Sequence, residues 1–237
     1  GNYKDLFGDK DFTKALRNTS IYVVFVVPCS IALSLLIAVL LNSNIKFRGL
    51  FQTIFFLPYV TSVIAIGLVW SWIFNSNYGL LNYVLSWFGI AKVQWLNKPK
   101  YALPSLIIFS VWKSMAFDIL IFLAGLQTIP KDLYNAARVD STPRWRVFWK
   151  ITVPGIAPMI SYAFIMGFIS AFKVYNEVFS LWGGKAGPAN SAITVVYYIY
   201  DKFYNSHNYG LASAAAVILF LIILVLTVVQ RMMGKKK

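Results

Sequence analysis

The feature of this sequence that most constrains its fold is an apolar run from Ser20 to Leu41 that contains no charged residue. As an α-helix, a run of that length measures roughly 33 Å, which exceeds the hydrocarbon core of a bilayer, about 30 Å. Such a segment can cross a membrane. The pattern, with four further long apolar runs, predicts an all-α fold, a polytopic transmembrane helical bundle in one domain over residues 1–237. The five expected spans are residues 20–41, 51–74, 103–126, 156–175 and 211–230.

The composition of the chain supports this interpretation. The sequence is 59% hydrophobic and 13% charged, whereas a soluble domain is roughly 45–50% apolar and about 25% charged. This difference excludes a typical soluble enzyme. A formal net charge of +14 would indicate nucleic-acid binding in a soluble protein, but Lys and Arg also gather in the short cytoplasmic loops of membrane proteins. We therefore expect a lipid bilayer as a partner, and no nucleic acid.

Two of the expected spans contain residues that are unusual in lipid. Pro58 lies within the second span and predicts a kink, because proline lacks the N–H that an unbroken helix requires. Lys113 and Asp118 lie within the third span. Each would cost about 2.5–3.5 kcal/mol at mid-depth if it faced lipid. Both side chains should therefore face protein or a water-filled cavity.

Positive charge in the connections predicts the orientation. Lys46 and Arg48 follow the first span without an acid, and four bases follow the last span, including Lys235, Lys236 and Lys237. Residues 127–155 also carry more bases than acids. Because Lys and Arg mark the cytoplasmic side, we expect a cytoplasmic C-terminus and an external N-terminus, with residues 1–19 outside. An N-terminus on that side normally requires a further helix upstream.

Residues for common chemistry are scarce in this chain. The run Gly183-Gly184-Lys185-Ala186 lacks the spacing and the hydroxyl of a phosphate-binding loop. His207 is the only histidine and Glu177 the only glutamate, so neither a His-rich metal site nor a paired-glutamate site can be assembled. We predict no catalytic, cofactor-binding or metal-binding residues and no enzymatic activity. A channel or a carrier driven by an ion gradient remains the alternative from another functional class.

The segment 127–155 is too long for a simple turn. Pro130 suits the first position of a helix, and Leu133, Ala136, Ala137 and Asp140 follow at helical spacing. Thr142 and Pro143 predict the cap and first residue of a second helix, which should end at Val153-Pro154. Two short helices with apolar faces suit either a groove on a cytoplasmic partner or the lipid surface.

This segment resembles a known family motif. The run from Leu133 to Asp140, followed by Phe148, Ile151 and Val153-Pro154, is similar to the E-A-A-x-x-D-G loop of binding-protein-dependent ABC importer permeases. The similarity is to the carbohydrate-uptake subfamily, the maltose-permease-like and glycerol-phosphate-permease-like proteins. It extends along nearly the whole chain, through residues 2–12, 17–19, 56–58, 79–82, 124–130 and 183–184.

The resemblance implies a function and a set of partners. Such proteins are permease subunits in the bacterial inner membrane that import a sugar or a sugar-like polyol by alternating access, and a span precedes the residues with which this chain begins. The implied partners are a second permease subunit in a heterodimer, two cytoplasmic ATPase subunits and an extracytoplasmic solute-binding protein. ATP and magnesium would be held by the ATPases, with no cofactor in this chain. An importer of the same superfamily for a non-carbohydrate solute is a further alternative.

In the family, the motif segment is a coupling helix that enters a cleft in the ATPase. Two positions depart from the motif, because Asn135 stands where Glu is expected and Ser141 where Gly is expected. If the Gly position required left-handed geometry, Ser would cost roughly 1–2 kcal/mol, and we expect the Thr142-Pro143 start to let the turn avoid it. The expected coupling residues are Leu133, Asn135, Ala136, Ala137, Asp140, Ser141, Arg144, Trp145 and Phe148.

A sugar is bound by aromatic rings that stack on its C–H faces and by polar groups that bond its hydroxyls. Phe172, Tyr175 and Asn176 are spaced to share one face at the end of the fourth span, and Trp112 and Ala116 are paired on the third, beside Lys113. Tyr59 follows Pro58. The resemblance places these positions at the substrate path, whereas helix packing or an interfacial aromatic belt is the alternative for each ring. Lys113 and Lys173 leave a phosphorylated polyol open as the solute.

Overall fold

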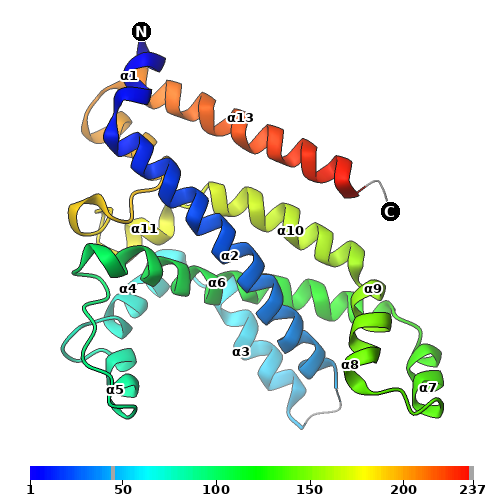
Figure 1. Cartoon of the computed structure of the whole chain (residues 1–237). Coiled ribbons are helices and arrows are strands. Elements are labelled where there is room, and N and C mark those ends of the chain that lie inside the picture. Colours follow the sequence, from blue (N-terminus) through cyan, green and yellow to red (C-terminus); the bar gives the residue numbers. More distant parts are fainter. Residues whose placement is uncertain (44–45, 235–237) are drawn as a thin grey trace. The chain divides into compact units, whose positions relative to one another are not determined.

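The computed structural model describes residues 1–43 and 46–234, and every regular element in these two ranges is a helix (Figure 1). The chain divides into two compact units. The first comprises Gly1–Val27, Thr61–Val111 and Phe168–Lys237, and the second comprises Pro28–Val60 and Trp112–Gly167. Three lysines that entered the orientation argument, Lys235, Lys236 and Lys237, lie outside the described residues.

Among the described residues, three helices are long and apolar enough to cross a membrane. They are α2 (Lys10–Asn42), α6 (Pro99–Thr128) and α13 (Tyr209–Gly234). The number rises to five if two broken pairs each count as one crossing. These pairs are α3 (Arg48–Val60) with α4 (Val63–Ile73), and Arg144–Gly155 with α10 (Ala157–Phe172). An all-helical chain with long apolar helices is confirmed.

Two expected spans differ from the prediction, because one is broken and the other ends early. The second was expected as one kinked helix, but it is divided between Val60 and Val63, shortly after Pro58. The fourth ends at Phe172 and not at Tyr175. Its last turn tightens, because the N–H groups of Lys173 and Val174 donate to carbonyls only three residues back, at 3.1 and 3.3 Å.

In the first unit, side chains of α2 hold a loop from the far end of the sequence. The Asn18 amide donates to the carbonyls of Ser191 at 3.0 Å and Ile193 at 2.9 Å. The Val195 N–H, at the start of α12 (Val195–Tyr200), donates to the Thr19 hydroxyl at 3.0 Å. Asn18 and Thr19 are both buried. These bonds satisfy polar groups that would otherwise be costly to bury.

A cluster of three side chains, which we call the Asp9 clasp, joins the chain's beginning to its last third. Asp9 lies between α1 (Asn2–Gly8) and α2, and it accepts hydrogen bonds from the Tyr198 hydroxyl at 2.8 Å and pairs with Lys202 at 3.1 Å. Burial alone would raise the pKa of Asp9, but the bonds from Tyr198, Lys202 and the Asp11 N–H hold that pKa below its ordinary value. Burial and the Asp9 carboxylate raise the pKa of Tyr198.

A buried amide organises a second loop of the first unit. Asn82 lies on α5 (Leu80–Ser86), and its side-chain N–H donates to the carbonyls of Ser76 at 3.2 Å and Val93 at 2.9 Å. Its side-chain oxygen accepts from the Val93 N–H and from the Trp95 indole at 3.0 Å. One side chain therefore fixes the segment between α4 and α6.

The core of the second unit is formed by buried apolar side chains from α2, α6 and α10, among them Leu35, Phe122 and Ala163. Glycines allow close approach there. A Cβ atom at Gly125 would lie 2.9 Å from Cγ of Met159, and one at Gly155 would lie 2.7 Å from Cδ1 of Ile129. Small residues at such contacts let membrane helices pack closely.

Asp118, expected to avoid lipid, is buried within the second unit, where it forms a hydrogen bond with the buried Ser30 hydroxyl. The neighbouring sequence positions explain this placement, because Phe122 and Ile119 on the same helix belong to the core. The side chain of this acid therefore faces protein. The expectation for Asp118 is confirmed.

Candidate functional site

The segment that carries the family motif folds as two short helices joined by a turn (Figure 1). The first is α7 (Lys131–Val139), and the second runs from α8 (Arg144–Val147) through a π-helical turn, η1 (Phe148–Thr152), to α9 (Val153–Gly155). Each helix begins one residue later than predicted. Pro143, and not Thr142, is the residue before the second helix, and no side chain caps it.

The second helix also ends later than predicted. The expected end at Val153-Pro154 is wrong, because the helix continues to Gly155 before the backbone leaves the helical region at Ile156. The preceding η1 turn widens the helix where Pro154 lacks an N–H donor, so the proline is accommodated without ending the helix.

The turn between the helices adopts the backbone conformation that was expected to be avoided. Ser141 has a φ of +52°, in the left-handed region. Its N–H donates to the carbonyl of Arg138 at 3.0 Å, and the preceding Asp140 N–H donates to Ala136 at 3.0 Å. The Thr142-Pro143 start does not replace this geometry. The position that is Gly in the motif therefore has the geometry for which glycine is suited.

The structure divides the nine predicted coupling residues between two faces of this segment. Ala137 is buried, and Phe148 is half-buried against the core of the second unit. Tyr134 strengthens this inner face, because its hydroxyl lies 3.2 Å from that of Thr152. The other seven are exposed: Leu133, Asn135, Ala136, Asp140, Ser141, Arg144 and Trp145.

Two exposed apolar residues of the segment are not among the predicted coupling residues. Val139 is 85% exposed and Trp149 is 62% exposed. Val139 does not follow the helical spacing of Leu133, Ala136 and Ala137, and an apolar residue outside that pattern is the signal that could have identified it. Leu133 and Trp145 are exposed as well, and we call these four exposed apolar residues the outer face.

In the second unit, three predicted substrate-path residues lie on or beside α6. Trp112 is partly exposed, but Ala116, one turn further on, is buried. Tyr59, on α3, stacks on Phe117 with ring centroids 5.3 Å apart and planes inclined by 21°. Lys113 lies next to Trp112 on the same helix and is half-buried. Helix α6 therefore combines a basic side chain with aromatic surface.

In the first unit, the predicted group of Phe172, Tyr175 and Asn176 does not share a helical face. Helix α10 ends at Phe172, Tyr175 has a non-helical backbone with φ −144° and ψ −55°, and Asn176 begins the next helix, α11 (Asn176–Leu181). Phe172 is buried against Phe168, with ring centroids 5.0 Å apart. The spacing argument failed because it assumed an unbroken helix. These three residues and those on α6 belong to different units.

Tyr175 instead belongs to an aromatic cluster that the sequence argument missed. Its ring centroid lies 5.0 Å from that of Tyr200, 5.6 Å from that of Phe179 and 6.2 Å from that of Tyr197. Burial and the neighbouring tyrosines raise the pKa of Tyr175, so its hydroxyl stays protonated and can both donate and accept hydrogen bonds. The dense tyrosines of residues 195–200 were the available signal.

No group of three or more His, Cys, Asp or Glu side chains that could hold a metal ion occurs in the part of the chain that the structure describes. The polar groups of the candidate sites are instead amides, hydroxyls and bases. Such groups can bind a solute through hydrogen bonds and charge.

Comparison with known proteins identifies relatives along the whole chain. Residues 30–237 match the family model of the binding-protein-dependent transport system inner membrane component. The arabinooligosaccharides transport system permease of Halalkalibacterium halodurans is 35% identical over 97% of this chain and 72% of its own length. The trehalose/maltose transport system permease of Thermococcus litoralis is 33% identical over 99% of this chain and 78% of its own.

A solved structure supports the same relationship. A chain of a bacterial alginate ABC transporter, in complex with a periplasmic protein that binds an alginate pentasaccharide, matches with a TM-score of 0.89 and 25% identity. The match covers 99% of this chain and 82% of that one. Alginate is an acidic polysaccharide.

Proposed function

This chain belongs to the family of binding-protein-dependent transport system inner membrane components, and from this premise we propose that it imports a sugar or a sugar-like polyol across the bacterial inner membrane. It is a permease subunit and not an enzyme, as its relatives are. The resemblance on which the sequence argument relied is confirmed. The carbohydrate proposal is supported by the sugar-transport relatives and by the aromatic side chains available to stack on sugar rings.

The proposed partners follow from the way such an importer is powered. Two cytoplasmic ATPase subunits would hold ATP and magnesium, and an extracytoplasmic binding protein would deliver the solute. A second permease subunit would complete the translocation path as a heterodimer. The sequence of this chain has no phosphate-binding loop of its own, which supports the placement of ATP on a partner.

The observation that carries the coupling proposal is the outer face of residues 131–155. Trp145, near the start of the second helix of the segment, is 64% exposed. So small a segment cannot bury this surface itself. Large exposed aromatic and aliphatic side chains are typical of protein interfaces, so the outer face suits an apolar cleft on the ATPase. Residues 127–155 would then be cytoplasmic, as their excess of bases also favours.

In the proposed mechanism, movement of the ATPases acts on the outer face and is transmitted to the permease through the inner face. Closure of the ATPases would push on Leu133 and Trp145. The Tyr134 hydroxyl, bonded to Thr152, and Phe148, packed on the core, would pass this movement to α6 and α10. The permease would then change from inward-facing to outward-facing and receive solute from the binding protein. Movement of packed helices past one another is a common form of such switching.

Two groups of residues, one within each unit, are each proposed to lie on the substrate path. Tyr175 offers a ring and a protonated hydroxyl, and Asn176 offers an exposed amide. Trp112 and Lys113 on α6 would supply a second aromatic surface and a positive charge. Lys113 favours a second candidate solute, an anionic sugar or a phosphorylated polyol. A charged residue within a membrane span is costly and typically marks a substrate path, and a positive charge on that path would attract an anion.

Association with the ATPase tests the function most directly. Leu133→Ala and Trp145→Ala, each in the assembled importer, should weaken retention of the ATPase on an affinity-tagged permease and lower solute uptake. The matched control is Trp87→Ala, which removes a tryptophan of similar exposure, 69%, just after α5. Truncation of an interface anchor typically costs about 2 kcal/mol, or roughly thirtyfold in affinity. Unchanged retention and uptake in both variants would refute the docking proposal.

A further inference from the structure

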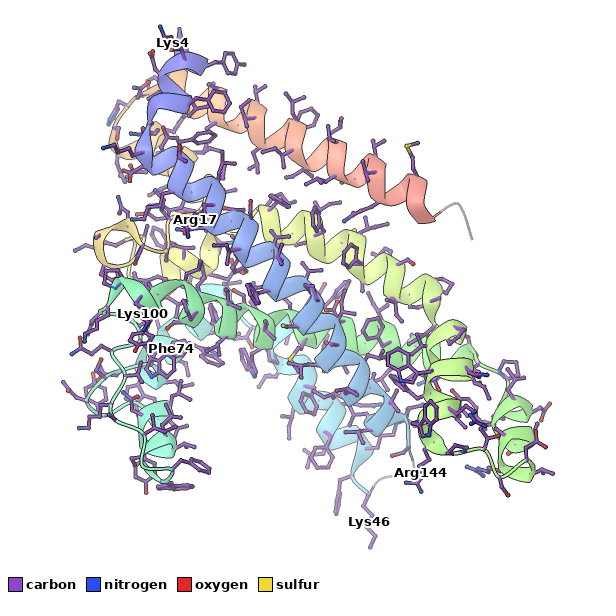
Figure 2. The ribbon with its side chains drawn as sticks, viewed as in Figure 1. Lys4, Arg17, Lys46, Phe74, Lys100 and Arg144 are labelled. Atoms are coloured by element: carbon purple, nitrogen blue, oxygen red, sulfur yellow. The ribbon has the colours of Figure 1, made fainter. Side chains whose placement is uncertain are left out.

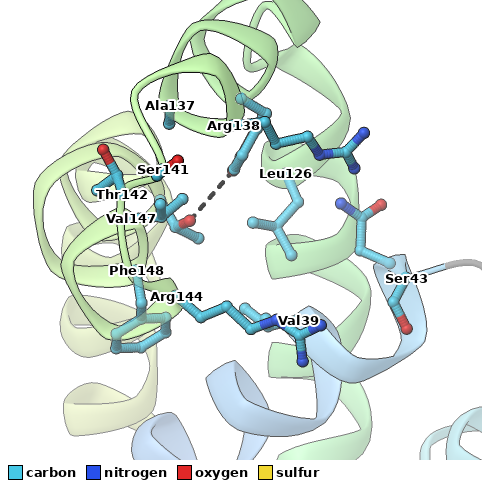
Figure 3. Close-up of a pocket in the computed structure, with 13 residues that line it drawn as sticks. Val39, Ser43, Leu126, Ala137, Arg138, Ser141, Thr142, Arg144, Val147 and Phe148 are labelled. Carbon is cyan, nitrogen blue, oxygen red and sulfur yellow. Dashed lines mark hydrogen bonds between the residues drawn. The ribbon is translucent and has the colours of Figure 1, made fainter.

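A cavity of about 700 Å³ lies on the inner side of the coupling segment, within the second unit. It is bounded by the end of α2, by α6, and by α7 and α8 with the turn between them (Figure 3). Polar side chains from three of these elements line it: Asn42 and Ser43 from the end of α2, Arg138 from α7 and Arg144 from α8.

The cavity has a strong excess of positive charge. Both Arg138 and Arg144 line it, whereas none of its described lining residues is acidic. Neither guanidinium group has a hydrogen bond or an ion pair with another described residue. A third guanidinium lies at the edge, because Arg48 Nη2 is 3.5 Å from the side-chain oxygen of Asn42. Figure 3 shows the Arg138 and Arg144 side chains both directed toward the end of α2 that carries Ser43.

The chemistry of the lining restricts which anion would fit. A guanidinium presents a planar fork that matches the oxygens of a phosphate, and two such groups can bind it from two sides. The Thr142 hydroxyl adds a neutral donor, whereas the Ser43 hydroxyl already donates to the Leu40 carbonyl at 2.6 Å. Val39, Leu126 and Phe148 make part of the wall apolar. A cavity with guanidinium groups and an apolar wall suits a phosphate ester that carries hydrocarbon.

We propose that this cavity binds a phosphate group, held by Arg138 and Arg144 between the end of α2 and the α7–α8 turn. The group has two chemical sources, the headgroup of an anionic phospholipid and a free phosphate anion. The phospholipid is the source that the apolar wall favours. Basic pockets between membrane helices on the cytoplasmic side bind anionic headgroups in this way.

The proposed site is separate from the outer face, although two expected coupling residues line it, Ser141 and Arg144 (the latter labelled in Figure 2). Leu133, Val139 and Trp145 are exposed and do not line the cavity. A phosphate bound there would connect α2 to the turn at Ser141, and would stiffen the segment from its inner side. The proposal therefore does not depend on the docking proposal, and binding can be measured without transport.

The test uses the full chain purified in its importer complex in a neutral detergent, and measures phosphate ligands in two ways. Mass spectrometry counts the phosphatidylglycerol retained per permease after the complex is washed. Equilibrium dialysis of delipidated complex measures binding of labelled inorganic phosphate. The variants are Arg138→Gln and the double variant Arg138→Gln/Arg144→Gln. The matched control is Arg146→Gln, whose side chain lies over the Trp145 ring, 5.6 Å from its centroid, and not in the cavity.

We expect wild type and Arg146→Gln to retain phosphatidylglycerol, and Arg138→Gln to weaken its binding roughly tenfold. Arg138→Lys, which keeps the charge but loses the fork, should weaken binding less and shows that the fold is intact. Retention of lipid without binding of inorganic phosphate assigns a headgroup, and arginine-dependent binding of both probes assigns a general phosphate site. Binding of neither probe, or equal loss in Arg146→Gln, overturns the proposal.

Discussion

The backbone N–H of Thr142 donates a hydrogen bond of 2.9 Å to the carbonyl oxygen of Ala137, five residues earlier. Together with the bond from the Ser141 N–H to the Arg138 carbonyl, this bond forms a Schellman motif. In such a motif, the residue that follows the C-cap of the helix has a left-handed backbone conformation. Ser141 occupies that position. The motif fixes the angle at which the second helix of the coupling segment leaves the first.

Ser141→Gly should stabilise the coupling turn. A non-glycine residue in the left-handed region costs the folded state roughly 1–2 kcal/mol. A glycine avoids that cost but lowers the free energy of unfolding by about 0.4–1 kcal/mol, because it increases the conformational entropy of the unfolded chain. The net expected gain is about 0.5–1 kcal/mol. Thermal unfolding of the purified complex measures it. Ser141→Ala is the control, since it removes the hydroxyl but keeps the unfavourable φ, and an equal gain in that variant would contradict the strain argument.

Much of the fold could be predicted from the sequence, because its strongest signals are local. The apolar runs beginning near Ser20, Leu103 and Leu211 correspond to α2, α6 and α13. The rise of a helix per residue and the thickness of the hydrocarbon core are both fixed, so the length of an apolar run indicates whether it can span the membrane. Shorter elements such as α12 were not predicted. They depend on contacts with distant residues, for example the bond from Val195 to Thr19, which no local pattern reveals.

The sites were predicted less completely, for physical reasons that differ by residue. Ala137 and Phe148 were expected on the docking surface because helical spacing cannot tell which of two apolar faces is buried by the protein itself. A charge at either residue would therefore disturb packing within the chain. The group at Tyr175 was misplaced because the end of α10 depends on a tightened last turn with no strong sequence signal.

The proposed substrate path predicts that aromatic surface and an amide are needed for uptake. Trp112→Ala, Tyr175→Ala and Asn176→Ala should each lower solute uptake, by roughly tenfold where a contact worth about 1.4 kcal/mol is lost. ATPase association and basal hydrolysis should remain, because the coupling segment is unchanged. Trp72→Ala is the control, as Trp72 is an exposed span residue outside the proposed path. If all three variants transport like wild type, the path lies elsewhere.

Lys113 separates the two candidate solutes. Lys113→Met removes the charge while nearly keeping the length of the side chain. Uptake of an anionic sugar or polyol phosphate should fall far more than uptake of a neutral sugar, which loses only hydrogen bonds. Competition between the two solutes in membrane vesicles, at equal protein abundance, measures the difference. Equal loss for both solutes would assign Lys113 a structural role.

Close packing between α4 and α11 predicts a sensitive glycine. A Cβ atom at Gly67 would overlap the Ser180 side chain. Gly67→Ala should therefore destabilise the first unit by about 1–3 kcal/mol. Ser180→Gly in the same chain should recover most of that loss. Gly49→Ala is the control, because nothing lies within 4 Å of its Cβ position, and helix propensity makes that change neutral or favourable. The yield of monodisperse protein and its thermal stability measure the effect.

The Asp9 clasp predicts a pH dependence confined to acid. Because the pKa of Asp9 is lowered in the folded chain, the carboxylate contributes stability above its unfolded pKa of about 3.9, and this contribution is lost as pH falls through the folded pKa. Asp9→Asn should therefore lower thermal stability at pH 7, with a difference from wild type that is constant from pH 5 to 8 and disappears only in stronger acid.

The control for this prediction is Asp5→Asn, which changes an exposed acid on α1. It should have little effect at any pH in that range, because surface charges contribute little to stability. A difference between Asp9→Asn and wild type that changed between pH 6 and 8 would assign the effect to another group.

The long-range bonds of the first unit have a consequence for the order in which the protein is made. The Asn18 amide cannot form its hydrogen bond to the Ser191 carbonyl until Ser191 has been synthesised, 173 residues later. At usual elongation rates this is a delay of roughly 10–35 s. The second unit, by contrast, is complete once Gly167 has been added. The first unit, which contains Asn18, is therefore completed after the second. A nascent chain that stops short of Ser191 lacks both carbonyl partners of the Asn18 amide, so this part of the first unit cannot complete its packing until the loop has been synthesised.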